Sequence, residues 1–219
     1  TCFNGKSHGT VDVRNALKKS CNIFFFDAGR RLGIDTLSSY GSMLGFGQKT
    51  GIELPGEAKG MLASRQYRLN KGQTWEEGET LLAAIGQTDN ATTPLQLCNY
   101  VATIARGGKR LEPHIIKSVR NSETGDIIME TVPVVTEEMN LSEKTKQTVL
   151  EGMEMVTQSG GSLYSSFKDF KMATIAGKTG TAEKDNQLPT SLIVGLAPAE
   201  NPKVAFAIVV EQGGASSSP

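Results

Sequence analysis

The chain has 219 residues, with 23 basic and 23 acidic side chains and a formal net charge of zero. This balance excludes a strongly basic nucleic-acid-binding surface and an acidic tail. A hydrophobic fraction of 38% and a charged fraction of 21% are typical of a globular core. The longest apolar run, residues 204–210, falls far short of the about 20 residues that span a bilayer.

Neither a methionine nor a charged signal-peptide region opens the chain, so we expect it to be part of a longer protein. The cysteines are Cys2, Cys21 and Cys98, and the histidines are His8 and His114. An odd number of cysteines without a C-x-x-C pair predicts neither a disulfide framework nor a zinc site. Both histidines are interpreted as surface or turn residues, and no metal or organic cofactor is expected.

The first part of the chain is predicted to be helical. Residues 12–19 and 22–32 have apolar side chains at helical spacing, and Gly33 after a basic pair indicates a helix end. Another helix is predicted from Asp35 to Phe46. Residues 47–78 carry turn residues without a long period and are expected to be irregular.

The clearest helix start lies at Thr93, where Pro94 fits the first helical position and Gln96 completes a capping box. Glycines 107 and 108 indicate the end of this helix. Residues 113–135 are predicted to form strands around a turn at residues 121–125.

A helix is predicted over residues 142–157, followed by β-type runs at 173–182, 190–197 and 203–211. The short links between these runs favour antiparallel neighbours. Helices first and strands last indicate an α+β domain rather than alternating βαβ units. No segment resembles an interdomain linker, so we expect one domain.

A first candidate motif, Gly177-Lys178-Thr179-Gly180-Thr181, opens the strand-rich part. Its glycines permit close backbone approach, so the strand can pair with an extended peptide, and its lysine and hydroxyls can hold an anionic group. A phosphate-binding loop is excluded because Met172, not glycine, lies five residues before Gly177. Alone, the segment is also compatible with an ordinary turn-rich strand.

A second candidate motif, Ser20-Cys21-Asn22, lies between two predicted helices. Taken alone, its serine and asparagine are most simply explained as helix caps. Together with Lys178-Thr179-Gly180, however, it reproduces the order of the S-x-N and K-T-G motifs of penicillin-binding proteins and serine β-lactamases.

Several further segments match in order, and the chain from about His8 to Gly214 resembles the transpeptidase domain of class B penicillin-binding proteins, particularly the elongation-type enzymes. The segments that carry this resemblance are His8–Leu17, Gly45–Glu57, Ile85–Gln87, Thr93–Leu97 and Ala176–Glu183.

The resemblance implies an α+β transpeptidase fold of the penicillin-binding/serine β-lactamase type, with an antiparallel sheet flanked by helices. It implies serine acyl transfer on peptidoglycan stem peptides that end in D-Ala-D-Ala, with β-lactam antibiotics acylating the same serine. The implied setting is the extracytoplasmic face of the cell membrane, with an anchor upstream of Thr1. A membrane glycosyltransferase is the expected partner, and no nucleic acid is expected to bind.

Three residues receive catalytic roles from the resemblance. The hydroxyl of Ser20 would help to pass a proton to the leaving amine. The amide of Asn22 would hydrogen-bond the substrate backbone and the lysine of the nucleophile. The cation of Lys178 would shape the field around the proton relay and the substrate carboxylate.

The substrate-binding residues implied by the resemblance are Thr179, Gly180 and Thr181. The two threonine hydroxyls would hold the substrate carboxylate. The backbone N–H of Thr181 would supply half of the oxyanion hole, a kind of donor that is typically worth about 3–4 kcal/mol in the transition state.

The S-x-x-K motif, which carries the nucleophile in this family, is missing before Ser20. The segment Ser165-Ser166-Phe167-Lys168 has this pattern but lies out of order, and we interpret it as coincidence. We therefore expect residues 1–219 to be a partial transpeptidase domain, truncated at both ends and inactive alone, from a serine-type D,D-transpeptidase.

Three alternatives remain open from the sequence: a non-catalytic β-lactam sensor or regulatory pseudo-transpeptidase, a hydrolase of the same fold, and an interaction module. Two departures from the family pattern bear on the substrate groove. Thr88 stands where relatives usually have glycine, and Ser191–Val194 stands where they often carry aromatic residues. Trp75 is interpreted as a packing residue.

Overall fold

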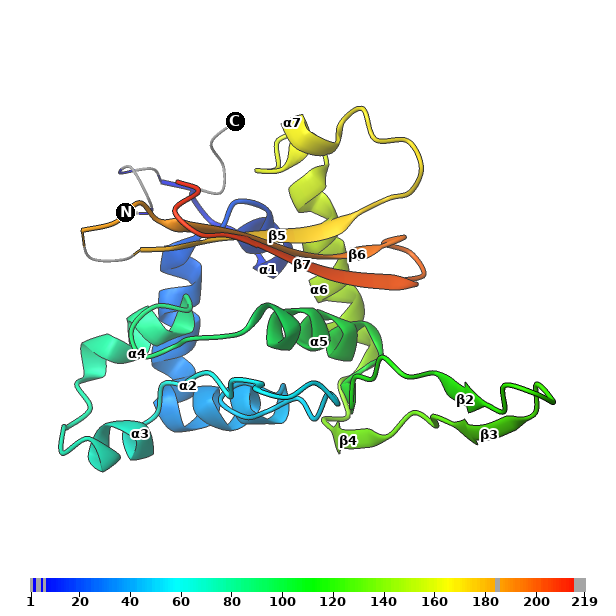
Figure 1. The fold of residues 1–219 in the computed structure, drawn as a ribbon. Coiled ribbons are helices and arrows are strands. Elements are labelled where there is room, and N and C mark those ends of the chain that lie inside the picture. The colour runs from blue at the N-terminus through cyan, green and yellow to red at the C-terminus, as the bar shows by residue number, and fades with distance from the viewer. Residues whose placement is uncertain (1, 3–4, 6, 184–185, 215–219) are drawn as a thin grey trace.

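The computed structural model describes residues 2, 5, 7–183 and 186–214 (Figure 1). Its helices are α1 (Val13–Lys18), α2 (Asn22–Met43), α3 (Arg65–Asn70), α4 (Glu77–Ala84), α5 (Pro94–Ala105), α6 (Glu143–Thr157) and α7 (Tyr164–Phe167). Its strands are β1 (Lys109–Leu111), β2 (Ser118–Arg120), β3 (Ile127–Glu130), β4 (Val135–Glu138), β5 (Ala176–Ala182), β6 (Thr190–Ala197) and β7 (Val204–Val210). Within these residues, no helix is long and apolar enough to span a membrane.

The two helices predicted on either side of Gly33 form one interrupted helix, α2. Gly33 has non-helical dihedral angles, φ 74° and ψ 160°, which break the hydrogen-bond ladder as the glycine signal indicated. The chain resumes its helical course directly afterwards and ends at Met43, three residues before the predicted boundary.

The prediction that residues 47–78 are irregular is wrong at its end, where α3 and the beginning of α4 lie. The hydroxyl of Ser64 accepts a hydrogen bond from the N–H of Tyr67 and caps α3. Glu76 and Glu79 form a reciprocal capping box that starts α4. Helices of six and eight residues are too short to give a clear apolar period, so their caps carry the signal.

The predicted capping box at the start of α5 is confirmed. The Thr93 hydroxyl accepts from the N–H of Gln96 at 3.1 Å, and the Gln96 carboxamide accepts from the N–H of Thr93 at 2.9 Å. Gln96 is almost fully buried, and its Nε2 also donates to the carbonyls of Gln48 and Lys59. One side chain therefore starts α5 and holds the irregular segment before it.

The expected strands within residues 113–135 are present as the β2–β3 hairpin, which projects away from the helices (Figure 1). A second antiparallel pair, β1 with β4, lies mostly outside the predicted range. Strands of three or four residues contain too few positions for alternation to reveal them.

The predicted antiparallel sheet of the C-terminal part is confirmed, with strand order β5-β6-β7. Its register places Lys178 opposite Val194 and Thr179 opposite Ile193. Helices α5 and α6 cover one face of this sheet through a single hydrophobic cluster, whose buried members are Val101, Ile104, Leu150, Met153, Ala176, Val194, Leu196 and Ala199. β5 lies at the end of the strand order, so one of its edges is not paired within the described sheet.

Helix α2 packs against α4 at a close crossing that depends on Gly29. A Cβ atom added to Gly29 would lie 2.4 Å from the Cβ of Ala84, a separation that requires one helix to move. This contact fixes α4 relative to the helix that begins at Asn22.

We expect Gly29→Ala to lower the free energy of unfolding by about 1–3 kcal/mol, because it overpacks the α2–α4 crossing. Gly78→Ala is the matched control, since its added Cβ meets nothing within 4 Å. That control is expected to stabilise the protein by about 0.4–1 kcal/mol through reduced freedom of the unfolded chain. Urea unfolding of the protein that carries this domain measures the free energy of unfolding of both variants. Equal changes in Gly29→Ala and Gly78→Ala would contradict overpacking at the α2–α4 crossing.

Candidate active site

The turn between α1 and α2 presents Ser20 toward β5. The backbone of Ser20 has φ +48°, an uncommon left-handed conformation for a residue other than glycine. The N–H of Ser20 donates to the carbonyl of Leu17, and the N–H of Cys21 donates to that of Ala16. These two backbone hydrogen bonds stabilise the conformation of the turn between α1 and α2.

The structure brings Ser20 and Lys178 together across 158 positions of sequence. Nζ of Lys178 donates to Oγ of Ser20 at 2.6 Å and to the carbonyl oxygen of Thr179 at 2.8 Å. No carboxylate forms an ion pair with Lys178 within the part of the chain that the structure describes. Burial of the ammonium group lowers the pKa of Lys178 to about 8, because a low-dielectric surrounding disfavours the charged form.

Asn22 is the first residue of α2 and is partly buried, two residues after Ser20. In the described residues no hydrogen bond joins its amide to Ser20 or Lys178, so the structure places it beside the pair without linking it to them.

The substrate-binding candidates lie on β5 and have distinct surroundings. Oγ1 of Thr179 is 3.4 Å from Oγ of Ser162, and the carbonyl oxygen of Thr181 accepts a hydrogen bond from Nε2 of Gln87 at 3.3 Å. A Cβ atom on Gly180 would lie 2.7 Å from Leu192 of the neighbouring strand. Sheet packing alone therefore explains the glycine at this position.

The out-of-order S-x-x-K segment does not join this group. Ser165 and Ser166 lie on α7, Lys168 follows it, and all three are exposed. The interpretation of this pattern as coincidence is consistent with its position.

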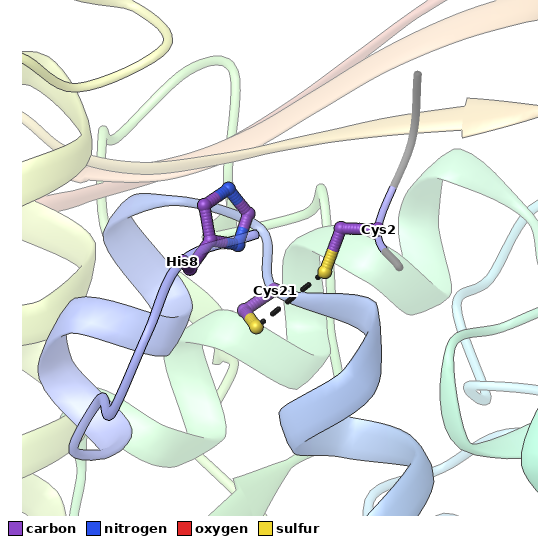
Figure 2. Close-up of side chains that lie close together, drawn as sticks. All are labelled: Cys2, His8 and Cys21. Atoms are coloured by element: carbon purple, nitrogen blue, oxygen red, sulfur yellow. Dashed lines mark hydrogen bonds between the residues drawn. The ribbon is translucent and has the colours of Figure 1, made fainter. Parts of the chain in front are cut away.

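A cluster of two thiols and an imidazole lies directly beside the Ser20 turn (Figure 2). The sulfur atoms of Cys2 and Cys21 are 3.6 Å apart and buried. One ligand atom from each of Cys2, His8 and Cys21 lies within 4.8 Å of the others. Nδ1 of His8 is buried and has no hydrogen-bond partner among the described residues.

Cysteine thiolates and an imidazole are the donor types that Zn²⁺ prefers, and three of them would occupy three positions of a tetrahedral site. The unpartnered nitrogen of His8 supports this fit, because buried polar atoms normally have partners. Zinc held there would tie the segment around Cys2 and His8 to the turn that carries Ser20. Separations of six and thirteen positions match no short zinc motif, so the cluster has no recognisable signal in the sequence.

We expect the protein to bind one Zn²⁺ ion through this cluster. Elemental analysis of the purified protein should show one equivalent of zinc, and chelation should lower the Tm. Cys2→Ser combined with His8→Ala should abolish the bound zinc, whereas Cys98→Ser, a partly buried cysteine elsewhere, should leave it unchanged. A metal content that is equal in these variants would contradict the site.

The family comparison agrees with this geometry. Residues 2–219 match the model of the penicillin-binding protein transpeptidase domain. A curated relative, the peptidoglycan D,D-transpeptidase MrdA of Acinetobacter baumannii, is 31% identical over 94% of this chain and 32% of its own length. Penicillin-binding protein H of Bacillus subtilis is 32% identical over 92% of this chain and 31% of its own length.

The fold agrees with solved structures as well. The crystal structure of Pseudomonas aeruginosa PBP2 in complex with WCK 5153 has a TM-score of 0.86 and 32% identity over 99% of this chain and 46% of that chain. The complex between PBP2 and MreC from Helicobacter pylori has a TM-score of 0.79 and 32% identity over 96% and 38%. The chain spans about a third of the length of its curated relatives. It belongs to the penicillin-binding protein transpeptidase domain family.

Proposed function

We propose that this chain is part of a peptidoglycan D,D-transpeptidase, which cross-links the cell wall by serine acyl transfer on stem peptides ending in D-Ala-D-Ala and binds penicillin. The observation that carries the proposal is the contact of Lys178 with Ser20, at 2.6 Å, in a chain of this family. The 219 residues contribute the S-x-N and K-T-G motifs, and the nucleophilic serine and its lysine come from outside them.

In this proposal the acyl donor lies along the edge of β5 as an extended peptide. The hydroxyls of Thr179 and Thr181, with the ammonium group of Lys178, hold its terminal carboxylate. The N–H of Thr181 stabilises the oxyanion that forms when the nucleophile attacks the penultimate carbonyl. The proton of the nucleophile passes through Ser20 to the leaving D-Ala amine, and an amine from a neighbouring stem peptide then takes the acyl group.

The pair of Lys178 and Ser20 suits this relay electrostatically. Among the described residues the partners of Lys178 are a hydroxyl and a carbonyl rather than a carboxylate, so its charge remains available to an anionic substrate. Its lowered pKa, about 8, places its proton close to the operating range of a proton relay. Asn22, beside them at the start of α2, would bind the substrate backbone.

The proposed setting is the extracytoplasmic face of the cell membrane, with the anchor upstream of this chain and a membrane glycosyltransferase as partner. The Helicobacter pylori PBP2 neighbour was solved in complex with MreC, which supports the expectation that proteins of this kind assemble with a protein partner.

Labelling with fluorescent penicillin followed by intact-mass analysis tests the function. A protein extended upstream to include the nucleophile should gain one covalent adduct, and the 219-residue chain should gain none. In the extended protein Lys178→Ala should slow acylation at least about tenfold, the effect of losing a charge-assisted hydrogen bond. Lys168→Ala, on the exposed S-x-x-K segment, should leave acylation unchanged. A folded extended protein that gains no adduct would overturn the function.

The pKa of Lys178 predicts a pH dependence of substrate binding. Below about pH 8 the ammonium group is charged and attracts the ligand carboxylate, and above that pH the attraction fades. The dissociation constant of the pre-covalent penicillin complex should therefore rise above about pH 8. In Lys178→Arg it should stay constant to higher pH, because guanidinium keeps its charge. The constant comes from saturation of the acylation rate, and the same pH dependence in both proteins would contradict the role of Lys178.

A further inference from the structure

The carbonyl oxygens along the unpaired edge of β5 accept hydrogen bonds from side chains of other elements and of β5 itself. The carbonyl of Ile175 accepts from Oγ1 of Thr157 at 2.6 Å, and that of Thr179 accepts from Nζ of Lys178 at 2.8 Å. The carbonyl of Thr181 accepts from Nε2 of Gln87. Since alternate residues of a strand direct their backbone groups to the same edge, these carbonyls all face away from β6.

The N–H and carbonyl of one strand residue point to the same edge. The Gln87 amide therefore lies on the side of β5 to which the N–H of Thr181 is directed. A donor fixed at the Thr181 carbonyl restrains the peptide plane between residues 181 and 182, and through the strand backbone it restrains the orientation of the Thr181 N–H.

Hydrogen bonds to neighbouring segments restrain the loop that carries Gln87. The N–H of Gln87 donates to the carbonyl of Leu82 at 2.9 Å, and the carbonyl of Gln87 accepts from Nδ2 of Asn90 at 3.1 Å. The carboxamide oxygen of Asn90 accepts from the N–H of Ala63 at 3.0 Å. The loop is therefore anchored to the end of α4 and to the segment before α3.

The next residue, Thr88, has φ +61°, a left-handed conformation that is costly for a β-branched side chain. The Arg68 guanidinium donates to the Thr88 hydroxyl at 3.3 Å and pairs with Asp89 and Glu79. The paired side chains of Arg68, Asp89 and Glu79 are partly buried, at 18–19% exposure. A partly buried ion network therefore holds the loop in this uncommon backbone conformation.

We propose that Gln87 is a positioning residue for acyl transfer, which holds the Thr181 backbone so that its N–H faces the developing oxyanion; this inference rests on the proposed function. Gln87 acts through Thr181 and touches no reacting atom. Loss of its donor changes the acylation step more than the binding of the ligand, because the oxyanion forms only in the transition state.

The test is two-step acylation kinetics of the protein that carries the nucleophile, with a penicillin as the probe. Gln87→Met keeps the size of the side chain and removes its donor. It should lower the acylation rate constant about threefold to tenfold, the worth of one neutral hydrogen bond, with little change in the pre-covalent dissociation constant. Gln66→Met on α3 is the matched control, since the Gln66 amide donates to Asn70 at an exposed position.

Gln87→Glu separates the hydrogen bond from general damage to the loop. An ionised glutamate cannot donate to the Thr181 carbonyl, but a protonated one can. The acylation deficit relative to the unmodified protein should therefore shrink as the pH falls from about 7 to about 4, around the ordinary pKa of glutamate. The deficit of Gln87→Met should not depend on pH.

The outcomes separate the two proposals. An unmodified protein that is not acylated overturns the proposed function and this inference with it. Normal acylation of the unmodified protein, with an unchanged rate constant in Gln87→Met, overturns only the role of Gln87. The role of Gln87 is also overturned if the acylation deficit of Gln87→Glu does not change with pH. It is overturned as well if the substitutions change only the pre-covalent dissociation constant and not the acylation rate constant. Either result indicates a structural effect that does not involve the orientation of the Thr181 N–H.

Discussion

A lysine buried against a serine hydroxyl, with no carboxylate paired to it among the described residues, is the contact that organises the candidate site. Burial destabilises the charged form of an ammonium group, and it therefore lowers the pKa of Lys178 to about 8. The rest of the fold holds the two residues together. Helix α6 packs on β5 and on α1, where a Cβ atom on Gly152 would lie 2.7 Å from Leu17. The position of Ser20 relative to Lys178 is therefore set by one helix that both partners share.

A second set of contacts connects the S-x-N and K-T-G motifs, through α2, α4 and the loop after α4. Helix α2 begins with the S-x-N asparagine and crosses α4 closely at Gly29, and the loop after α4 brings Gln87 to the Thr181 carbonyl. The K-T-G strand is thus held by α6 behind it and by Gln87 at its edge. These contacts restrain the backbone of a seven-residue strand that is paired on one side only within the described sheet.

The cluster of Cys2, His8 and Cys21 adds a structural role to the S-x-N triplet. Cys21 stands between Ser20 and Asn22, so a metal ion held by its sulfur would restrain the turn that aims both residues. At the middle position of the triplet, the thiol of Cys21 lies close to a second thiol and an imidazole (Figure 2). Membership of the transpeptidase family accounts for the two flanking residues and leaves the cluster to be explained by its own donors.

Local patterns in the sequence determined the α5 capping box at Thr93 and the break at Gly33, because each depends on neighbours within a few residues. The antiparallel order of β5 to β7 followed from the short links between consecutive strands. The ordered motifs identified the family and assigned Ser20 and Lys178 to one site, and the structure added the direct contact between them. Only the tertiary structure decided the positions of Cys2, His8 and Gln87, whose partners lie 6 to 94 positions away and form no periodic signal. Short helices such as α3 escaped prediction for a related reason: caps and packing, rather than an apolar period, stabilise them.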